Sequence, residues 1–435
     1  MSLFSFYFYA LFVVVLFLSA LTKSKIVLLI ASFIFIAFQS WIAAAVLFSV
    51  IILTYFCAKR KKKTWQYMGI VSLVILLCFY KFAEKSHLNI IVPLGVSFFT
   101  FSAISYLADI ARGEYSAADF LHTALYLSFF PKLTSGPLQK ASDFFMQLDS
   151  ERNITRKNLS DGLQIYCFGL FKKIVLADHL SVFVNEVYAT PAAFSSASIL
   201  LALVSYSLQI YFDFSGYSDM AIGAGKMLGF NLPQNFNTPY LAENVTDFWR
   251  RWHISLSTWI RNYIYISLGG NRKGKTRQMF NLIFAMTFCG LWHGATINFV
   301  LWGFLHGVAL AIHKKFRHLC ETKRIVLPRS ISVLLTFAFV SLLWVPFRAT
   351  SITDALFIYH RLFLFTTGLN QPYFWSFISI AVFAFSTILI QNRDKAFYPI
   401  LDFKKISHLT AFFVYLGLLF CLCYTGGSPF IYGAF

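Results

Sequence analysis

Long uncharged runs, divided by short clusters of basic residues, constrain this chain more than any other feature. Residues 2–22, 26–58 and 278–312 contain no Asp, Glu, Lys or Arg. A helix that spans a bilayer needs about 20 apolar residues, so each run is long enough to cross at least once. Charged residues make up 13% of the chain, against roughly a quarter in soluble domains. The pattern predicts an all-α polytopic membrane protein. We expect residues 2–22 to stay as a first helix, because no cleavage site of a signal peptide follows them.

The basic clusters predict orientation rather than a nucleic-acid partner. The formal net charge is +19, and the densest cluster is Lys59-Arg60-Lys61-Lys62-Lys63. Short clusters beside apolar runs mark the cytoplasmic face of a membrane protein. A nucleic-acid surface would need a continuous basic face, which the sequence lacks. The seven cysteines are odd in number and form no CxxC, so neither a disulfide framework nor a metal site is predicted.

Three apolar runs carry signals that should break or shorten their helices. Residues 26–58 are too long for one span and should form two helices that turn near Gln39-Ser40. Residues 88–108 contain Pro93-Leu94-Gly95, which predicts a helix that is broken or starts late. Residues 120–131 are too short to span, and we expect an in-plane or re-entrant segment there.

Polar stretches inside this apolar sequence predict irregular backbone and a hairpin. We expect residues 139–161 to form a surface loop. The stretch Asp213 to Asp219 is predicted to be irregular and to line a cavity, because polar backbone needs such surroundings at membrane depth. The run 278–312 has basic clusters at both ends, which predicts a hairpin. His293 lies near its midpoint, so it should lie deep in the membrane or towards the outer face.

His293 is the first candidate for a catalytic residue. An imidazole can take a proton near neutral pH, and this suits a general base that activates a hydroxyl for acyl transfer. The alternative is a structural histidine bonded between helices. His306 is 13 residues further on, too far along a helix to share a local site, and we interpret it as structural.

A second group of candidates lies between Asp247 and Ile266, where we expect an amphipathic helix in the membrane plane. It contains His253 and four candidates for binding an acyl donor, namely Trp249, Arg250, Arg251 and Ser255. Arginines near the cytoplasmic surface could hold the phosphates of a donor. They could equally extend to lipid headgroups. The sequence leaves both readings open.

Several motifs together resemble the membrane-bound O-acyltransferase (MBOAT) family, and most closely its bacterial branch that acetylates alginate and peptidoglycan. The motifs are Ser135-Gly136-Pro137, Ser215 to Gly223, Asp247 to Ser257, Leu268 to Arg272 and Leu291-Trp292-His293-Gly294. The resemblance implies one integral domain over residues 1–435, with a core at about 90–315. Its fold would be a funnel-shaped bundle of roughly 11–13 transmembrane, re-entrant and in-plane helices.

The resemblance also implies chemistry. His293 matches the catalytic histidine of the family, and His253 matches its second histidine, on the cytoplasmic side. The acyl donor would be a cytoplasmic thioester, acetyl-CoA, acting as substrate, with no bound cofactor. An extracytoplasmic transferase of the SGNH type would complete the transfer, next to membrane lipids and a polysaccharide acceptor. The location implied is the bacterial inner membrane.

The C-terminal tail, residues 426–435, adds one more candidate. Phe430-x-Tyr432-x-x-Phe435 is similar to a C-terminal tyrosine motif of bacterial surface O-acylation systems, which makes Tyr432 a candidate relay for the acyl group. The alternative is an aromatic anchor at the interface. Gly426-Gly427-Ser428-Pro429 breaks the preceding helix and could let the tail fold inwards.

The sequence therefore predicts a membrane O-acetyltransferase component for a cell-surface polysaccharide, with peptidoglycan preferred. Alginate or another exopolysaccharide is the nearest alternative, followed by D-alanyl transfer. A transporter or flippase for an acyl carrier, which makes and breaks no bonds, is the rival from another class. A scaffold that only recruits an extracytoplasmic enzyme is the third possibility.

Overall fold

The computed structural model describes residues 3–83, 92–150, 154–323, 327–391, 398, 400–426 and 431. Over these residues the fold is all-α and its helices run from α1 to α18. Five helices in the described part are long and apolar enough to cross a membrane: Trp41–Lys59, Lys63–Ala83, Ser196–Met227, Ile297–Arg317 and Arg329–Arg348. The fold class predicted from the uncharged runs is confirmed.

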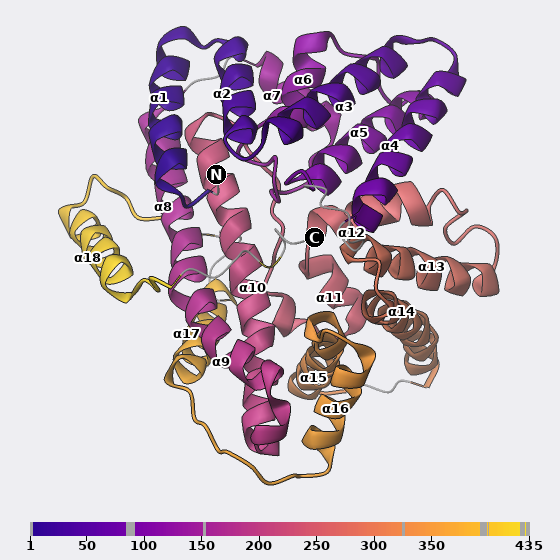
Figure 1. Ribbon diagram of the computed structural model, residues 1–435, viewed down its shortest axis with the longest axis vertical. Coiled ribbons are helices and arrows are strands. Elements are labelled where there is room, and N and C mark those ends of the chain that lie inside the picture. Colours follow the sequence, from indigo (N-terminus) through magenta and orange to yellow (C-terminus); the bar gives the residue numbers. More distant parts are fainter. Residues whose placement is uncertain are drawn as a thin grey trace.

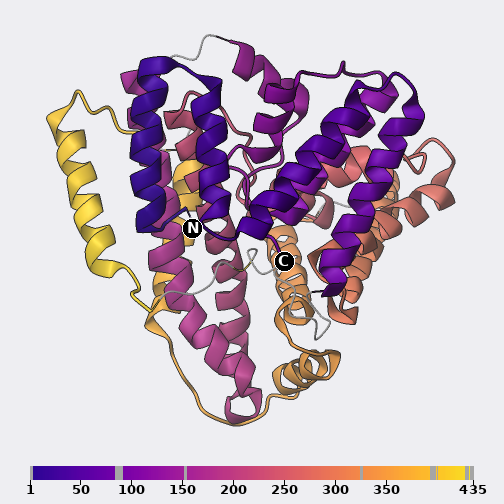
Figure 2. The same cartoon turned by 45° about the horizontal axis from the view of Figure 1, so that its top comes forward.

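The first helices turn where the sequence predicts. α1 (Phe6–Thr22) leads to α2 (Lys25–Ala37) and α3 (Trp41–Lys59), and the Ser40 side chain accepts a hydrogen bond from the Ala43 amide to cap α3. α4 (Lys63–Ala83) follows the basic cluster. The α1–α2 and α3–α4 connections lie at the same upper end of the molecule in Figures 1 and 2. Both connections are basic, so the positive-inside rule assigns this end to the cytoplasm. The sequence predicts that Glu84 to His87, which follow α4, lie on the outer side of the membrane. These residues are not among those that the structure describes.

Two irregular segments meet below this end. α5 (Val96–Arg112) starts late, as predicted, after Gly95 adopts a left-handed conformation with φ 79°. A Cβ at Gly95 would lie 2.5 Å from the Leu133 carbonyl oxygen, so only glycine allows this approach. Residues 129–137, which follow the short helix α6 (Phe120–Ser128), are all buried in protein. Buried protein surroundings are the condition under which such backbone is tolerated at membrane depth.

The prediction of a surface loop at 139–161 is wrong. Ala141–Asp149 form α7, and α8 begins at Arg156 and ends at Phe171. Phe144, Phe145 and Leu148 are spaced so that one face of α7 is apolar, and all three are buried. The mixed charges of the segment hide this pattern.

The prediction of irregular backbone at Asp213–Asp219 is also wrong. These residues lie inside one continuous helix, α10 (Ser196–Met227). The glycines permit close packing instead of a break: a Cβ at Gly216 would lie 2.6 Å from the Gly169 carbonyl oxygen, and one at Gly223 would lie 2.5 Å from that of Gly162. Each glycine pair is seven residues, or about two turns, from the next, so α8 and α10 pack along one seam of small residues. In Figure 1 they form a long pair through the middle of the molecule.

The remaining helices complete the bundle. α8 passes through a π-helical segment, η1 (Lys172–Ala177), into α9 (Asp178–Ala189). α11 (Val245–Arg251) and α12 (Ile254–Trp259) are short, and a second π-helical segment, η4 (Ile260–Tyr265), follows. α13 (Lys275–His293) and α14 (Ile297–Lys323) form the predicted hairpin. α15 (Arg329–Arg348), α16 (Ile352–Phe363), α17 (Phe374–Gln391) and α18 (Ile406–Leu422) come last.

Candidate active site

His293 is the last residue of α13, at the turn of the hairpin. Three glycines bring the two helices together. A Cβ at Gly290 would lie 2.1 Å from the Phe299 carbonyl oxygen, one at Gly303 would lie 2.2 Å from that of Met286, and one at Gly307 would lie 2.6 Å from the Ile283 Cα. Backbone contact of this kind is how small residues tighten helix pairs in membranes. The seam therefore fixes the place of the His293 ring.

Aromatic side chains from three helices surround His293. Its ring centroid lies 4.6 Å from that of Trp292, 5.3 Å from that of Trp302 and 5.2 Å from that of Phe347. The side chain is 2% exposed. These rings come from α13, α14 and α15, so the position of the imidazole depends on the packing of all three.

His253 occupies the break between α11 and α12. Its backbone has φ 42° and ψ 54°, the left-handed region that non-glycine residues rarely adopt. The predicted single in-plane helix over Asp247–Ile266 is therefore wrong, because the chain turns at this residue and continues as a π-helix from Ile260. Strained backbone of this kind is concentrated at functional sites. The His253 side chain is 1% exposed and lies 4.6 Å from the ring of Phe214.

Asn235 fixes the orientation of His253. The Asn235 side-chain oxygen accepts the Ser255 amide at 3.1 Å and the Ser255 hydroxyl at 2.8 Å. An amide N–H can only donate, so this atom is the carbonyl oxygen. It lies 3.2 Å from His253 Nδ1, which must then carry the proton that it donates. In the neutral ring, Nε2 is therefore the atom with a lone pair for acid–base work.

Trp292 lies between the two histidines. Its ring centroid is 4.6 Å from that of His293 and 6.4 Å from that of His253. His253 and Lys81 are close enough to His293 to interact with it electrostatically. The structure thus brings together the two histidines that the sequence singles out 40 residues apart, and adds a lysine that the sequence reasoning missed.

Three cavities meet around α12. The polar cavity has about 410 Å³ and is lined by residues that include Ser102, Gln139, Lys140, Ser255, Asn262 and Tyr263. The arginine cavity has about 540 Å³ and is lined by residues that include Trp249, Arg250, Thr258, Arg261, Tyr265 and Met286. The apolar cavity has about 510 Å³ and is lined by residues that include Lys81, Phe101, Trp259, Tyr263, Leu291 and Trp292.

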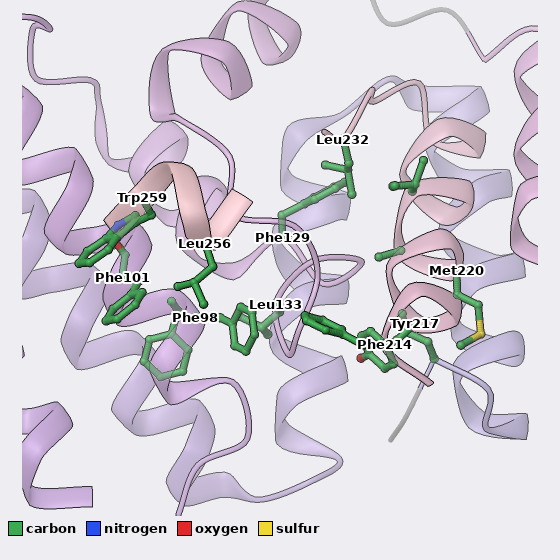
Figure 3. Close-up of a cluster of buried hydrophobic side chains, with 14 of the residues drawn as sticks. Phe98, Phe101, Phe129, Leu133, Phe214, Tyr217, Met220, Leu232, Leu256 and Trp259 are labelled. Atoms are coloured by element: carbon green, nitrogen blue, oxygen red, sulfur yellow. The ribbon is translucent and has the colours of Figure 1, made fainter. Parts of the chain in front are cut away.

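The polar cavity belongs to the cytoplasmic end. Lys140 and Asp143 in its wall come from the start of α7, and Asp149 at the end of α7 pairs with Lys25 of the basic α1–α2 connection at 2.9 Å. The apolar cavity reaches Trp292 and Ala295, which flank the buried His293 in the chain. Figure 3 shows Trp259 and Phe101 face to face beside Leu256, with ring centroids 4.0 Å apart. These stacked rings lie between the two cavities, since Trp259 lines both.

The four predicted donor-binding residues separate into three environments. Trp249 and Arg250 line the arginine cavity, and Ser255 lines the polar cavity. Arg251 instead bonds to Asp247 at 2.9 Å and to the Thr238 hydroxyl at 3.4 Å, so it holds the preceding loop. Tyr432 lies outside the described residues.

His306 has the packing of a structural residue. It is fully buried, and its Nδ1 accepts the indole N–H of Trp249 at 3.3 Å. Its ring lies 4.9 Å from that of Trp302, which also contacts His293. It therefore supports the walls of the site from behind.

Sequence reasoning missed Lys81, Asn235 and Arg261. Lys81 lies near the end of α4 and is 9% exposed. In the sequence, a lysine at the end of an apolar run indicates only topology. Its burial, which marks a functional candidate, is visible only in the structure. Asn235 lies in a loop with no motif of its own. Arg261 stands one turn beyond the motif and could have been found by helical spacing. In the described part of the chain, no group of three or more His, Cys, Asp or Glu side chains is arranged to hold a metal ion.

The two buried imidazoles line neither cavity, but their chain neighbours Ile254 and Trp292 line the polar and the apolar cavity, and together they form the candidate membrane-embedded site. The model of the membrane-bound O-acyltransferase family matches residues 29–353, and the chain belongs to this family. It is therefore a multi-pass membrane protein and an acyltransferase.

Curated relatives support the bacterial branch of the family. The chain is 37% identical over 380 residues to the peptidoglycan O-acetyltransferase of Helicobacter pylori, covering 76% of this chain and 72% of that protein. It is 36% identical over 394 residues to the probable alginate O-acetylase AlgI of Pseudomonas aeruginosa, covering 84% and 75%. The teichoic acid D-alanyltransferase of Bacillus subtilis is 27% identical over 275 residues, covering 58% and 67%.

Proposed function

We propose that this protein takes an acetyl group from a cytoplasmic thioester, acetyl-CoA, and delivers it across the inner membrane for O-acetylation of a cell-surface polysaccharide, with peptidoglycan as the preferred acceptor. A separate extracytoplasmic transferase of the SGNH type completes the transfer. The carrying observation is the pair of buried histidines around Trp292, next to a polar cavity at the basic end of the bundle. A thioester made inside the cell can reach such a site without the whole donor crossing the membrane.

Each residue then has a defined task. Arg250 and Arg261 hold the phosphates of the donor in the arginine cavity, whose wall Trp249 completes, because guanidinium groups bind phosphate with paired hydrogen bonds. His253, turned by Asn235, presents Nε2 to the sulfur side of the thioester. His293 is the general base that removes the proton from the attacking hydroxyl.

The hydroxyl that attacks is that of Tyr432. Its oxygen forms a bond to the thioester carbonyl carbon while His293 takes the proton. The carbon–sulfur bond then breaks, and the thiolate takes the proton from His293 and leaves as the free thiol. The product is an acetyl ester on Tyr432, which the hydroxyl of the extracytoplasmic acceptor attacks in turn, returning a proton to the tyrosine oxygen.

Alginate or another exopolysaccharide stays as the second acceptor class. The supporting observation is the relative named probable alginate O-acetylase, at an identity only one percentage point below that of the peptidoglycan O-acetyltransferase. The lower identity and coverage of the D-alanyltransferase make D-alanyl transfer the weaker alternative.

The decisive experiment follows radiolabelled acetyl-CoA with the purified protein in vesicles. Wild-type protein should release free CoA and carry an acetyl group on Tyr432, detected by mass spectrometry of the C-terminal peptide. His293→Ala should insert and fold normally but lose both signals. Normal surface acetylation in His293→Ala would favour a transporter, and normal acetylation in Tyr432→Phe would leave only direct transfer to the acceptor. Neither acetyl label nor CoA release from the wild type would support a scaffold.

A further inference from the structure

One side of the apolar cavity is a row of four aromatic rings, which we call the aromatic wall. Trp292, the neighbour of His293, stacks on Phe101 with ring centroids 5.3 Å apart. Phe101 stacks on Trp259 at 4.0 Å, and Trp259 lies 5.3 Å from Tyr263. All four rings line the apolar cavity, and Trp259 and Tyr263 also line the polar cavity. At these two residues a single side chain therefore separates the two cavities.

Hydrogen bonds to α5 hold the aromatic wall in place. The Trp259 indole N–H donates to the Phe101 carbonyl oxygen at 3.1 Å. The Tyr263 hydroxyl donates to the Asp109 carboxylate at 2.9 Å. The Arg112 guanidinium carbon lies 5.2 Å from the centre of the Tyr263 ring, within the range of a cation–π contact. Neither ring can turn aside without losing these interactions, so the wall is fixed rather than adaptable.

The spaces on the two sides of the wall suit different parts of a ligand. Gln139, Lys140 and Ser255 give the polar cavity its hydrogen-bonding groups. The apolar cavity has about 510 Å³, and Leu77 and Ile104 are typical of its lining. This volume lies within the range of about 300–1,000 Å³ for ligand sites, and apolar cavities take up apolar ligands. A hydrocarbon chain that starts in the polar cavity would be accommodated best on the far side of the wall.

We propose that Trp259 and Tyr263 determine which acyl group this protein accepts. They restrict the donor to a short chain such as acetyl, because a longer chain on the thioester meets the aromatic wall instead of entering the apolar cavity. The inference rests on the proposed function, in which the thioester is bound next to the polar cavity. It adds the feature of this chain that selects among thioesters of different length.

The test compares kcat/KM for acetyl-CoA and butyryl-CoA in the wild type and in Trp259→Leu, which shortens the wall but keeps an apolar side chain. Burial of one methylene is worth about fourfold in binding, so the two extra methylenes should raise the butyryl-to-acetyl ratio on the order of tenfold. Tyr263→Leu opens the same wall and should raise the ratio too, should Trp259→Leu fail to fold. Phe129→Ala is the matched control: Phe129, also in Figure 3, is fully buried but lines neither cavity, so the ratio should stay within about twofold of the wild type.

A double variant shows where the longer chain goes. Ala108 lines the apolar cavity but not the polar one, so Ala108→Phe fills the proposed space. Added to Trp259→Leu, it should return the butyryl-to-acetyl ratio to near the wild-type value.

Three outcomes separate this inference from the proposed function. An unchanged ratio in both Trp259→Leu and Tyr263→Leu would overturn the selection by the wall. A gain that persists after Ala108→Phe would overturn the apolar cavity as the space for the chain. If the wild type does not turn over acetyl-CoA, the proposed function fails. The ratio of the dissociation constants for butyryl-CoA and acetyl-CoA, measured with the same wall variants in the His293→Ala background, then still decides whether the wall selects.

Discussion

Gly290→Ala should damage activity through the place of His293 rather than through its chemistry. The added Cβ would lie 2.1 Å from the Phe299 carbonyl oxygen, about 1.3 Å short of the 3.4 Å at which ordinary contact begins. The obstacle is backbone, so it cannot rotate away as a side chain would. α13 and α14 must therefore part by an amount on the order of 1 Å, three residues before the proposed base.

Two magnitudes follow. Overpacking of a tight core costs about 1–3 kcal/mol, which leaves most of the protein folded and lowers its thermal midpoint. A displacement of about 1 Å at a catalytic group costs roughly 100-fold in rate. Gly417→Ala is the matched control, since no atom lies within 4 Å of a Cβ placed there in α18. That control should keep full activity and gain about 0.5–1 kcal/mol of stability from the better helix former.

The assay is acetyl-CoA turnover per folded protein, with the folded fraction measured by size-exclusion chromatography and thermal unfolding in the same detergent. A loss of activity that only tracks the loss of folded protein would refute the positional argument. Normal rate and stability in Gly290→Ala would refute the close helix approach itself.

Three further predictions test other parts of the site. Arg250→Ala should raise the KM for acetyl-CoA about tenfold, because Arg250 lines the arginine cavity. Arg251→Ala should mainly lower thermal stability, because Arg251 bonds to Asp247 and to the Thr238 loop. Measuring KM and the melting temperature of both variants checks this, and equal effects on KM would contradict it. Lys81→Met should lower kcat about 10- to 100-fold with little change in KM, because it removes a cation of the apolar cavity that interacts electrostatically with His293, while keeping the length of the side chain. Steady-state kinetics in which only KM moves would contradict this. Hydrogen bonds from His122 and Lys25 lower the pKa of Asp149. Their stabilising effect is therefore present above the usual aspartate pKa near 3.9 and is lost as the pH falls further. The free energy of unfolding, measured from pH 7 to pH 3, should fall more steeply in the wild type than in Asp149→Asn.

Breaks that depend on neighbouring residues could be predicted from the sequence. The turn at Gln39-Ser40 follows from a capping serine inside an overlong apolar run. The late start of α5 follows from Pro93 and Gly95, which restrict the backbone by themselves. The hairpin of α13 and α14 follows from the basic clusters at both ends of the run 278–312. His293 lies at the turn because it is near the midpoint of this run. In each case the cause lies within a few turns of the effect.

Features that depend on distant partners could not be predicted. His253 is recognisable by motif, but its left-handed backbone and its orientation depend on Asn235, 18 residues earlier in a loop. Lys81 became a candidate only through its electrostatic interaction with His293, which lies more than 200 residues away in the sequence. The role of Arg251 in holding the Thr238 loop is invisible for the same reason.

The stretch from Asp213 to Asp219 shows why polarity alone misleads in a membrane protein. A carboxylate in an apolar run must find a partner, and the sequence offers two solutions: irregular backbone around water, or a cation on a neighbouring helix. The first would unwind α10, and the second keeps it straight. Lys172 and Lys173 supply the second, at 2.6 and 2.7 Å, while Gly169 and Gly216 bring the two backbones near enough for the short aspartate side chains to be reached. The same polar residues that predict a break therefore keep the helix whole, and one of them, Asp213, has a second oxygen that accepts the Ile431 amide at 2.7 Å.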